Sequence, residues 1–429
     1  MRRSFFLLLL LPVLFGRPAF AQEVIPLTDK GGLHAAYVVP TDTFNRVDVQ
    51  LIVLSGKYDD PDPSGTAHLT EHLAAFSADF TILKQARERD IHATTSNVAT
   101  IYTNSGPPVD LETLLKLSRA TLDTPDLPEG FAESEIDIVE RETLLRERQS
   151  PLRWLRHIAL KNLYGAPRGR VDNSVADLPK LSLEKAYQFH KEHYVASNVT
   201  LIVSGRVDPD LVATLVAEVF GDTEATPAPS KPWLAQRPSP KVAYVDRIET
   251  DRLQRDTIQF AKFVAFEGNP TSVDMQSTFF ITTTILNERL FKALYHDQPG
   301  FLSVSQNWFF SKESDLELTL HAQLMPGFDL DRAHRRLKEA VARLLDDPIT
   351  RPEIQNARQK QITWAENSAR RPTSFRWFLS NVAADGFPPI TPTGLIEILS
   401  ETTDEEVREF AATAMQPSAT SVVLAKKVE

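Results

Sequence analysis

The 429-residue chain contains no cysteine, which excludes a disulfide framework and any metal site built on thiolates. A metal site in this protein must therefore use histidine and carboxylate side chains. Long apolar runs are also scarce. The run at the N-terminus, Phe5–Phe15, is too short to span a bilayer comfortably, and no second one follows. We therefore expect no stable membrane span.

The N-terminal apolar run belongs to a pattern that is typical of a secretory signal peptide. Arg2 and Arg3 supply the positive charge before it, and residues 19–21, Ala-Phe-Ala, form a small-x-small cleavage site after it. The sequence thus predicts a signal peptide over residues 1–21 and a mature chain that starts near Gln22. The periplasm is the predicted location, with the outside medium as the alternative.

Basic charge is scarce as well. The chain has 47 lysines and arginines against 57 aspartates and glutamates, a net charge of −10, and no basic run longer than a few residues. This balance argues against nucleic acid as a partner. A hydrophobic content of 42% and a charged content of 24% are typical of a folded globular protein. The length fits two domains of about 200 residues better than one.

Proline is concentrated near the middle of the mature chain. Five prolines lie between Thr223 and Lys241, a density that disfavours helix and strand and indicates an extended linker. This linker, 223–241, separates a predicted N-terminal domain over 22–222 from a predicted C-terminal domain over 242–429.

The two predicted domains resemble each other. The segment 182–204 has the pattern of a capped amphipathic helix, a short turn and a buried strand. The segment 403–425, shifted by 221 positions (403 − 182), repeats that pattern. The identical residues in the two copies are Glu184 and Glu405, Phe189 and Phe410, and Ser197 and Ser418. An internal duplication is the simplest account, and two unrelated helix–strand units are the alternative.

The first domain contains both strand and helix patterns. Residues 46–54 alternate between polar and apolar types, as a half-buried strand does, and 91–103 predicts one or two more strands. Helices are predicted over 66–76, 111–122 and 133–147. Strands followed by helices in each half indicate the α+β class, in which helices pack on a mostly antiparallel sheet.

The predicted helix 66–76 carries the run His-Leu-Thr-Glu-His at 68–72. Residues three and four apart share a helix face, so His68, Glu71 and His72 point into the same space. Two imidazoles at this spacing can bind one Zn2+, and the carboxylate between them can act on a zinc-bound water. The alternative is a polar helix face that happens to carry two histidines.

A hydrolytic zinc site usually has three protein ligands, so a third must come from elsewhere in the chain. The Glu-rich helix 133–147 is the candidate source, although most of its glutamates are expected to be solvated. A second histidine pair, His190 and His193, could also hold a metal at its helical spacing. The second copy of that helix has Ala411 and Ala414 at these positions, so a structural role is the favoured interpretation.

These features resemble those of the pitrilysin/insulinase family of zinc metallopeptidases, the inverzincins, which includes the mitochondrial processing peptidases. Beside the zinc motif, the resemblance is carried by the loop 55–57 and 65–68, the edge strand Ala93-Thr94-Thr95, the helix and strand 189–205, and Arg289-Leu290-Phe291 at the expected start of a second-domain helix. The resemblance implies a zinc endopeptidase whose two duplicated α+β domains form a clamshell around peptides or unfolded segments.

The resemblance also implies roles for individual residues. With a correction for a shorter segment before the Ala93 strand, Glu142 is the third zinc ligand, and Glu147 is the alternative. Glu135, two helical turns before Glu142, supports the site, and Glu71 is the general base. The strand at 92–95 binds peptide by β-augmentation. His92 stands where the family usually has asparagine, and it either hydrogen-bonds substrate backbone or caps the strand.

One departure from the family pattern concerns the second domain, which usually carries an arginine and, seven residues later, a tyrosine. This chain has Tyr295 and Leu302 at those positions, and neither supplies the missing group. Either a homologous partner subunit supplies the Arg/Tyr pair in trans, which makes this chain the zinc-bearing subunit of a heterodimer, or Arg289 does that work. The alternative function is a non-catalytic core or scaffold subunit; a metal-binding module without hydrolysis is a weaker third.

Overall fold

The computed structural model describes residues 23–61, 65–82, 90–165, 181–239, 242–266, 273–296, 300–310, 315–384 and 389–428. The predicted signal peptide and its cleavage site lie outside these ranges. Within them, no helix combines the length and the apolar character that crossing a membrane requires.

The N-terminal half is built on a six-stranded sheet with the order β1-β2-β6-β3-β5-β4. Its strands are β1 (Ile25–Pro26), β2 (Ala35–Pro40), β3 (Val47–Val53), β4 (Asp90–Thr95), β5 (Thr100–Gly106) and β6 (Val199–Gly205). β2 and β6 run parallel, and the other neighbouring strands run antiparallel. β4 lies at the edge of this sheet.

The C-terminal half contains a five-stranded sheet with the order β7-β11-β8-β10-β9. Its strands are β7 (Ala243–Thr250), β8 (Thr257–Ala265), β9 (Phe301–Phe310), β10 (Asp315–Leu324) and β11 (Ala419–Lys427). Only β7 and β11 run parallel. The order and directions repeat those of β2-β6-β3-β5-β4, which confirms the predicted fold of two duplicated α+β units.

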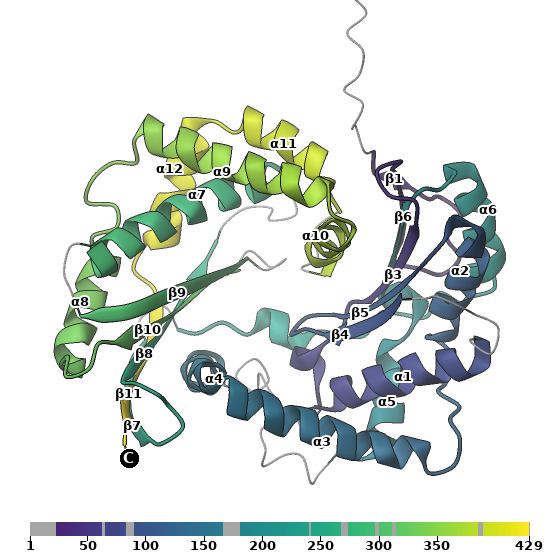
Figure 1. The fold of residues 1–429 in the computed structure, drawn as a ribbon, viewed down its shortest axis with the longest axis horizontal. Coiled ribbons are helices and arrows are strands. Elements are labelled where there is room, and N and C mark those ends of the chain that lie inside the picture. Colours follow the sequence, from purple (N-terminus) through teal and green to yellow (C-terminus); the bar gives the residue numbers. More distant parts are fainter. Residues whose placement is uncertain are drawn as a thin grey trace, which may run out of the picture.

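Twelve α-helices occur among the described residues, and they cover the two sheets (Figure 1). In the first half these are α1 (Thr66–Ile82), α2 (Leu111–Ala120), α3 (Phe131–Gln149), α4 (Pro151–Tyr164), α5 (Leu183–His193) and α6 (Pro209–Phe220). In the second half they are α7 (Val273–Phe291), α8 (Leu330–Ala342), α9 (Arg351–Ala369), α10 (Pro372–Ala384), α11 (Pro392–Glu401) and α12 (Asp404–Met415). The helix expected to begin at Arg289 begins sixteen residues earlier, at Val273 (289 − 273), so that expectation was wrong.

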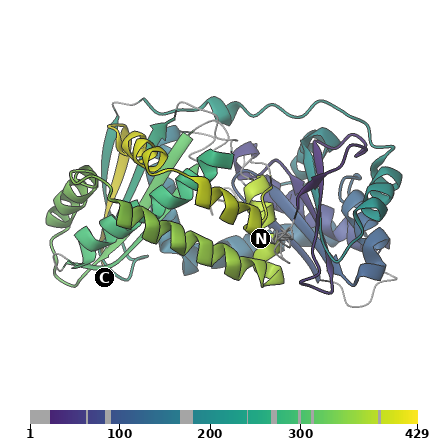
Figure 2. The same cartoon turned by 90° about the horizontal axis from the view of Figure 1, so that it is seen from above.

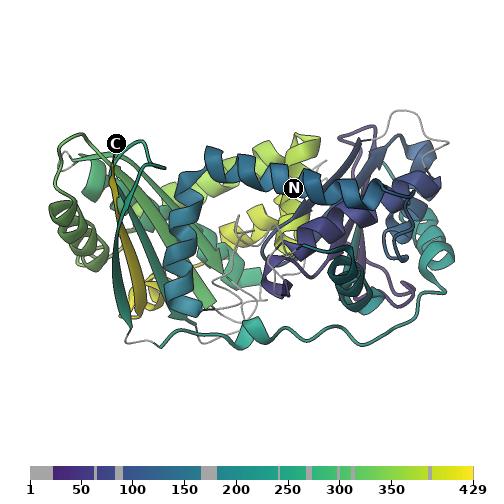
Figure 3. The same cartoon turned by 90° about the horizontal axis from the view of Figure 1, so that it is seen from below.

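The proline-rich segment runs along one side of the molecule between the two halves (Figures 2 and 3). Its described residues form no strand or α-helix, only the short 3-10 helix η6 (Pro232–Ala235). The Trp233 indole is buried, packs on the Tyr58 ring and donates a hydrogen bond from Nε1 to Asp59 at 2.7 Å. The segment is therefore anchored to the first half. The domain limits 22–222 and 242–429 stay a prediction.

Each half covers part of its sheet with a helix from the other half. α4, from the N-terminal half, packs on β8 and β11, and α10, from the C-terminal half, packs on β3, β5 and β6 (Figure 1). Leu155 of α4 lies in one apolar cluster with Phe263 of β8, and Phe375 of α10 lies in another with Ile52 of β3. The two halves thus share apolar cores, and both exchanged helices lie between the facing sheets of the clamshell.

Candidate metal centre

The helix α1 begins where a buried carboxylate satisfies its first backbone amides. The Asp60 side chain accepts hydrogen bonds from the N–H groups of Gly65 at 2.7 Å and Ala67 at 2.6 Å, which is how aspartate commonly stabilises a helix N-terminus. Burial raises the pKa of Asp60 to about 7, while the two amides lower it. Further along, Leu69 and Leu73 pack against Val139 of α3. The register of α1 against α3 is thereby set by apolar contacts below the polar face.

The polar face of α1 meets one carboxylate of α3. His68, His72 and Glu142 each offer a ligand atom, and these three atoms lie within 4.8 Å of one another. His68 Nε2 lies 3.5 Å from Glu142 Oε2. Two imidazoles and one carboxylate form a ligand set that suits a zinc ion with a fourth position left for water. The Glu142 side chain is 36% exposed, so the cluster is open to solvent on that side.

Glu135 lies on the same face of α3, seven residues before Glu142, and contacts the second histidine. Its Oε2 lies 2.8 Å from Nδ1 of His72, and the residue is only 1% exposed. Because a carboxylate accepts, Nδ1 of His72 carries the proton and Nε2 keeps its lone pair for a metal. The arrangement therefore brings Glu135 to the place where sequence reasoning put a supporting group.

Glu71 is the third polar residue on this face of α1, and it is 5% exposed. Its Oε2 accepts a hydrogen bond of 2.5 Å from Oγ1 of Thr95, the last residue of β4. Its main-chain oxygen accepts one from the buried Tyr102 hydroxyl at 3.4 Å. Sequence reasoning did not single out Thr95 as a site residue. The signal that could have found Thr95 was the alternation of side chains along β4, which places residues 93 and 95 on one face of the strand.

His92 lies on the opposite face of β4 from Thr95 and is exposed. It stands within the strand, third of its six residues, so it does not cap the end. β4 is an edge strand, which leaves one side of it without a strand neighbour among the described residues. The side chain of Glu147, the alternative ligand, lies outside the described residues.

The second histidine pair is buried on α5 and has partners away from the cluster. His190 Nε2 lies 3.1 Å from the Thr121 carbonyl oxygen, and His193 Nδ1 lies 2.9 Å from Ser55 Oγ. Burial lowers the pKa of His190 to about 4 and that of His193 below its usual value. Both imidazoles are therefore neutral at physiological pH and serve as packed hydrogen-bonding groups, in keeping with the structural interpretation.

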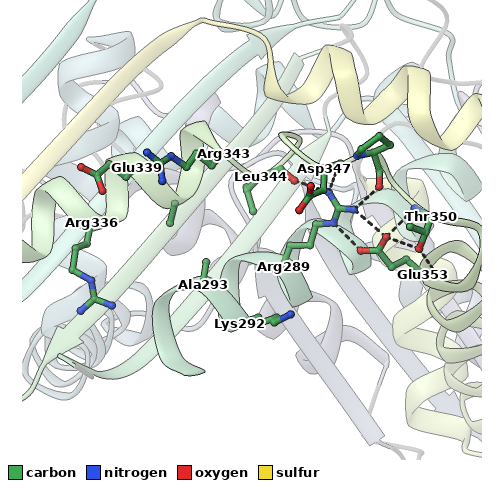
Figure 4. Close-up of a pocket in the computed structure, with 12 residues that line it drawn as sticks. Arg289, Lys292, Ala293, Arg336, Glu339, Arg343, Leu344, Asp347, Thr350 and Glu353 are labelled. Atoms are coloured by element: carbon green, nitrogen blue, oxygen red, sulfur yellow. Dashed lines mark hydrogen bonds and ion pairs between the residues drawn. The ribbon is translucent and has the colours of Figure 1, made fainter. Parts of the chain in front are cut away.

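Arg289 is held in the last turn of α7 by a dense set of acceptors (Figure 4). It forms a bidentate ion pair with Glu353, at 2.7 and 2.9 Å, which lowers the pKa of Glu353 to about 2. It also donates to the carbonyl oxygens of Leu344, Asp347 and Pro348 at 2.7 to 3.0 Å. This arginine lines a cavity of about 900 Å³ and ties α7 to the loop before α9. It has a structural role, so the alternative in which it reaches the substrate is not supported.

The two positions that depart from the family pattern also lie in this half. Tyr295, in the π-helix η7 (Lys292–His296), is 42% exposed and stacks on Phe291 with a centroid distance of 4.9 Å. Leu302, in β9, is 38% exposed. Neither side chain supplies a positive charge.

Sequence comparisons match this chain to peptidases. Residues 180–361 match the family model described as Peptidase M16 inactive domain. The chain is 25% identical over 207 residues to the uncharacterized zinc protease YmfH of Bacillus subtilis, covering 47% of each protein. It is 26% identical over 236 residues to the mitochondrial-processing peptidase subunit beta of Neurospora crassa, covering 52% of this chain and 48% of that one. The chain thus spans about half the length of these curated relatives.

Solved structures show the same fold over nearly the whole chain. A protease from Helicobacter pylori gives a TM-score of 0.74 at 18% identity, covering 94% of this chain and 100% of that one. The first half of the periplasmic protease PqqL from Escherichia coli gives 0.71 at 15% identity, covering 94% and 92%.

The fold, with two duplicated units in a clamshell, and the sequence matches both resemble those of M16 peptidases. The predicted resemblance to the M16 peptidases, the pitrilysin/insulinase family, is confirmed, and the relatives include zinc proteases. The matched family segment begins at residue 180, beyond α1 and α3. The word "inactive" in its description therefore refers to a part of the chain that contains neither the two histidines nor Glu142.

Proposed function

We propose that this chain is an exported zinc endopeptidase and the catalytic subunit of a heterodimer. The observation that carries the proposal is the convergence of His68, His72 and Glu142, with ligand atoms within 4.8 Å of one another, beside the buried carboxylate of Glu71 on the same helix. The zinc proteases among its relatives support the same conclusion.

The chain's own residues have distinct roles in this proposal. His68, His72 and Glu142 hold the Zn2+, which when bound supplies Lewis acidity and lowers the pKa of water. Glu135 fixes the tautomer and orientation of His72 through its hydrogen bond to Nδ1. Glu71 accepts a proton from the attacking water at its carboxylate and returns it to the leaving amine.

The substrate is a peptide or an unfolded protein segment that lies between the two halves. β4 is the edge strand nearest the cluster, since its Thr95 touches Glu71. An extended peptide can add to this edge through main-chain hydrogen bonds, which give affinity with little selectivity for sequence. His92, exposed on β4, is positioned to contact such a peptide.

The heterodimer is proposed because the second half lacks the expected Arg/Tyr pair. Tyr295 and Leu302 occupy the two positions, and Arg289 is bound by Glu353 and three carbonyl oxygens. In this proposal a homologous partner subunit supplies the Arg/Tyr pair in trans. Export to the periplasm rests on the N-terminal signal pattern, and one solved structure of the same fold is a periplasmic protease.

The proposal is tested with Glu71→Gln, assayed alone and together with a homologous chain that carries the Arg/Tyr pair. We expect the wild-type chain to bind zinc in equimolar amount, by metal analysis, and to cleave an unfolded peptide only with its partner. Glu71→Gln should retain zinc and lose cleavage, because an amide cannot accept the proton. Glu133→Gln, an exposed residue of α3, is the matched control and should behave as wild type.

Two outcomes contradict separate parts of the proposal. Cleavage by Glu71→Gln at the wild-type rate removes the assigned base. Full activity of the isolated chain removes the need for a partner. The second candidate function, a non-catalytic core or scaffold subunit, is favoured by the altered pair at Tyr295 and Leu302. It predicts a stable complex with the homologue and no cleavage by either wild-type or variant chains.

A further inference from the structure

We propose that Thr95 is a positioning residue: its hydroxyl holds the Glu71 carboxylate in the orientation for proton transfer and links that carboxylate to the strand on which the peptide docks. The inference rests on the proposed function, since it concerns the base of that reaction. The hydrogen bond from Thr95 Oγ1 to Glu71 Oε2 is 2.5 Å long, which is at the short end for a hydroxyl donating to a carboxylate.

The proton of the Thr95 hydroxyl has one acceptor that suits it. A threonine hydroxyl donates a single proton. The other hydroxyl near it, Thr100 Oγ1, lies 3.4 Å away and donates its own proton to the Ser55 carbonyl oxygen at 3.0 Å. The Thr95 proton goes to Glu71 Oε2, because that contact is 2.5 Å long against 3.4 Å to Thr100 and its acceptor is a carboxylate.

Glu71 depends on such a donor because its surroundings are largely dry. The residue is 5% exposed, and an ionised carboxylate that leaves water must be compensated by hydrogen bonds. The Tyr102 hydroxyl donates to the main-chain oxygen of Glu71, whereas Thr95 donates to its side chain. Thr95 thus fixes the rotation of the carboxylate plane, while α1 fixes the position of its backbone.

Thr95 is itself held rigidly. It is a β-branched residue with a restricted χ1, and it pairs with Thr100 across the β4–β5 hairpin. The turn that follows is closed by hydrogen bonds from Ser96 N to the Ala99 oxygen at 2.8 Å and from Ala99 N to Ser96 Oγ at 3.0 Å. The hydroxyl therefore has a fixed place relative to the strand.

The same turn also contacts the loop that starts α1. The N–H of Lys57 donates to the Ser96 oxygen at 3.0 Å, and that of Tyr58 donates to the Asn97 oxygen at 2.8 Å. Asp60, three residues after Lys57, accepts from the first amides of the helix. The docking strand and the Glu71 helix are thus joined at two points, the turn and the Thr95 hydroxyl. A peptide that adds to β4 therefore pairs with the same strand whose Thr95 orients the Glu71 carboxylate.

The experiment removes the hydroxyl while it preserves the shape. Thr95→Val is close in shape to threonine and keeps its strand preference, so we expect normal folding, full zinc content and an unchanged KM in the complex with the partner. A misplaced reacting group costs on the order of 100-fold in rate, so kcat should fall about 10- to 100-fold. Thr95→Ser, which keeps the donor, should recover kcat to within about threefold. Thr200→Val, a buried threonine of β6 in the same sheet, is the control and should leave kcat unchanged.

The outcomes separate this inference from the proposed function. If Glu71→Gln is inactive while Thr95→Val keeps the wild-type kcat, Thr95 does not position the base and only this inference is overturned. If Glu71→Gln cleaves as well as wild type, the proposed function fails and the inference fails with it. Should Thr95→Val not fold, Thr95→Ala removes the same hydroxyl and must show the same loss of kcat without a change in KM. A loss that Thr95→Ser does not recover also contradicts the donor role.

Discussion

At the scale of single residues, the site depends on hydrogen bonds between its side chains. One ring nitrogen of His72 faces the cluster, and the other contacts Glu135. The Glu71 carboxylate accepts a hydrogen bond from Thr95. Glu135 is the more buried of the two glutamates on the shared face of α3. Its carboxylate lies inside the protein against His72, while the Glu142 side chain keeps solvent contact, as the proposed open zinc site would require.

Glu135→Gln should weaken zinc binding about 10- to 100-fold, the usual range for loss of a partner that orients a ligand histidine. Glutamine can still accept from Nδ1, but it carries no charge to increase the basicity of His72. The measurement is competition for zinc with a chelator of known affinity. Glu140→Gln, on the same helix and not in the cluster, provides the comparison, and equal affinities for the two variants would contradict the assignment.

The sequence predicts this set of residues only in part. The spacing of 68, 71 and 72 requires a shared face once a helix is assumed, and the spacing of 135 and 142 does the same for α3. Which glutamate of α3 meets α1 depends on how the two helices pack, and Leu69, Leu73 and Val139 decide that in three dimensions. Thr95 was missed for the same reason, because its partner lies on another element.

At the scale of elements, the start of α1 is controlled by a buried acid. Asp60 is almost inaccessible to solvent, and burial raises its pKa to about 7 from an ordinary value of 3.8. A carboxyl group with a raised folded-state pKa binds protons more tightly in the native state. Its contribution to stability is full below about pH 4 and is lost as the pH rises through 7.

The free energy of unfolding of wild type relative to Asp60→Asn should therefore fall between pH 4 and pH 7.5. The expected change is on the order of a few kcal/mol. Because other groups titrate equally in both proteins, the difference between the two urea midpoints isolates Asp60. A difference that is flat across this range, or that rises with pH, would show that the two amides of Gly65 and Ala67 outweigh burial.

The observed element boundaries show where sequence patterns are sufficient to predict a helix or strand. The strand predicted over 46–54 and the helix over 111–122 correspond closely to β3 and α2. The helix predicted to end at Phe76 continues to Ile82, since the sequence offers no glycine or proline to stop it there. The second-domain helix was placed from Arg289 because of a family likeness, whereas its apolar pattern begins at Val273.

At the scale of the whole molecule, the two halves are interlocked rather than merely joined by a linker. Composition and duplication predict two similar units, but an apolar helix face does not reveal which sheet covers it. The exchange of α4 and α10 between the sheets was therefore not predictable. Each exchanged helix also carries an arginine that pairs with a buried acid of the opposite sheet. Arg156 contacts Glu317 at 3.0 Å, and Arg376 contacts Asp48 at 3.2 Å.

The interlocking predicts that both halves unfold in one transition, because neither can lose its sheet without exposing the core of the other. Arg376 is the sharpest probe, since it is buried and also donates to Ser105 at 2.5 Å. Arg376→Met leaves Asp48 with the partly exposed Arg46 as its remaining cation. Breaking one side of a buried pair costs roughly 3–5 kcal/mol, and because Arg46 and Ser105 still contact Asp48, we expect a loss at the lower end of that range.

Calorimetry of wild type and Arg376→Met tests this directly. We expect a single peak in both proteins, at a lower temperature in the variant. Adding Asp48→Asn should partly restore the peak temperature, because it removes the buried carboxylate charge that has lost Arg376. Lys360→Met, which breaks an exposed ion pair with Glu288, should shift the peak little, since such pairs contribute less than about 1 kcal/mol. Two separate peaks in wild type would mean that each half is stable alone. The exchanged helices would then be contacts between independent domains, not parts of a common core.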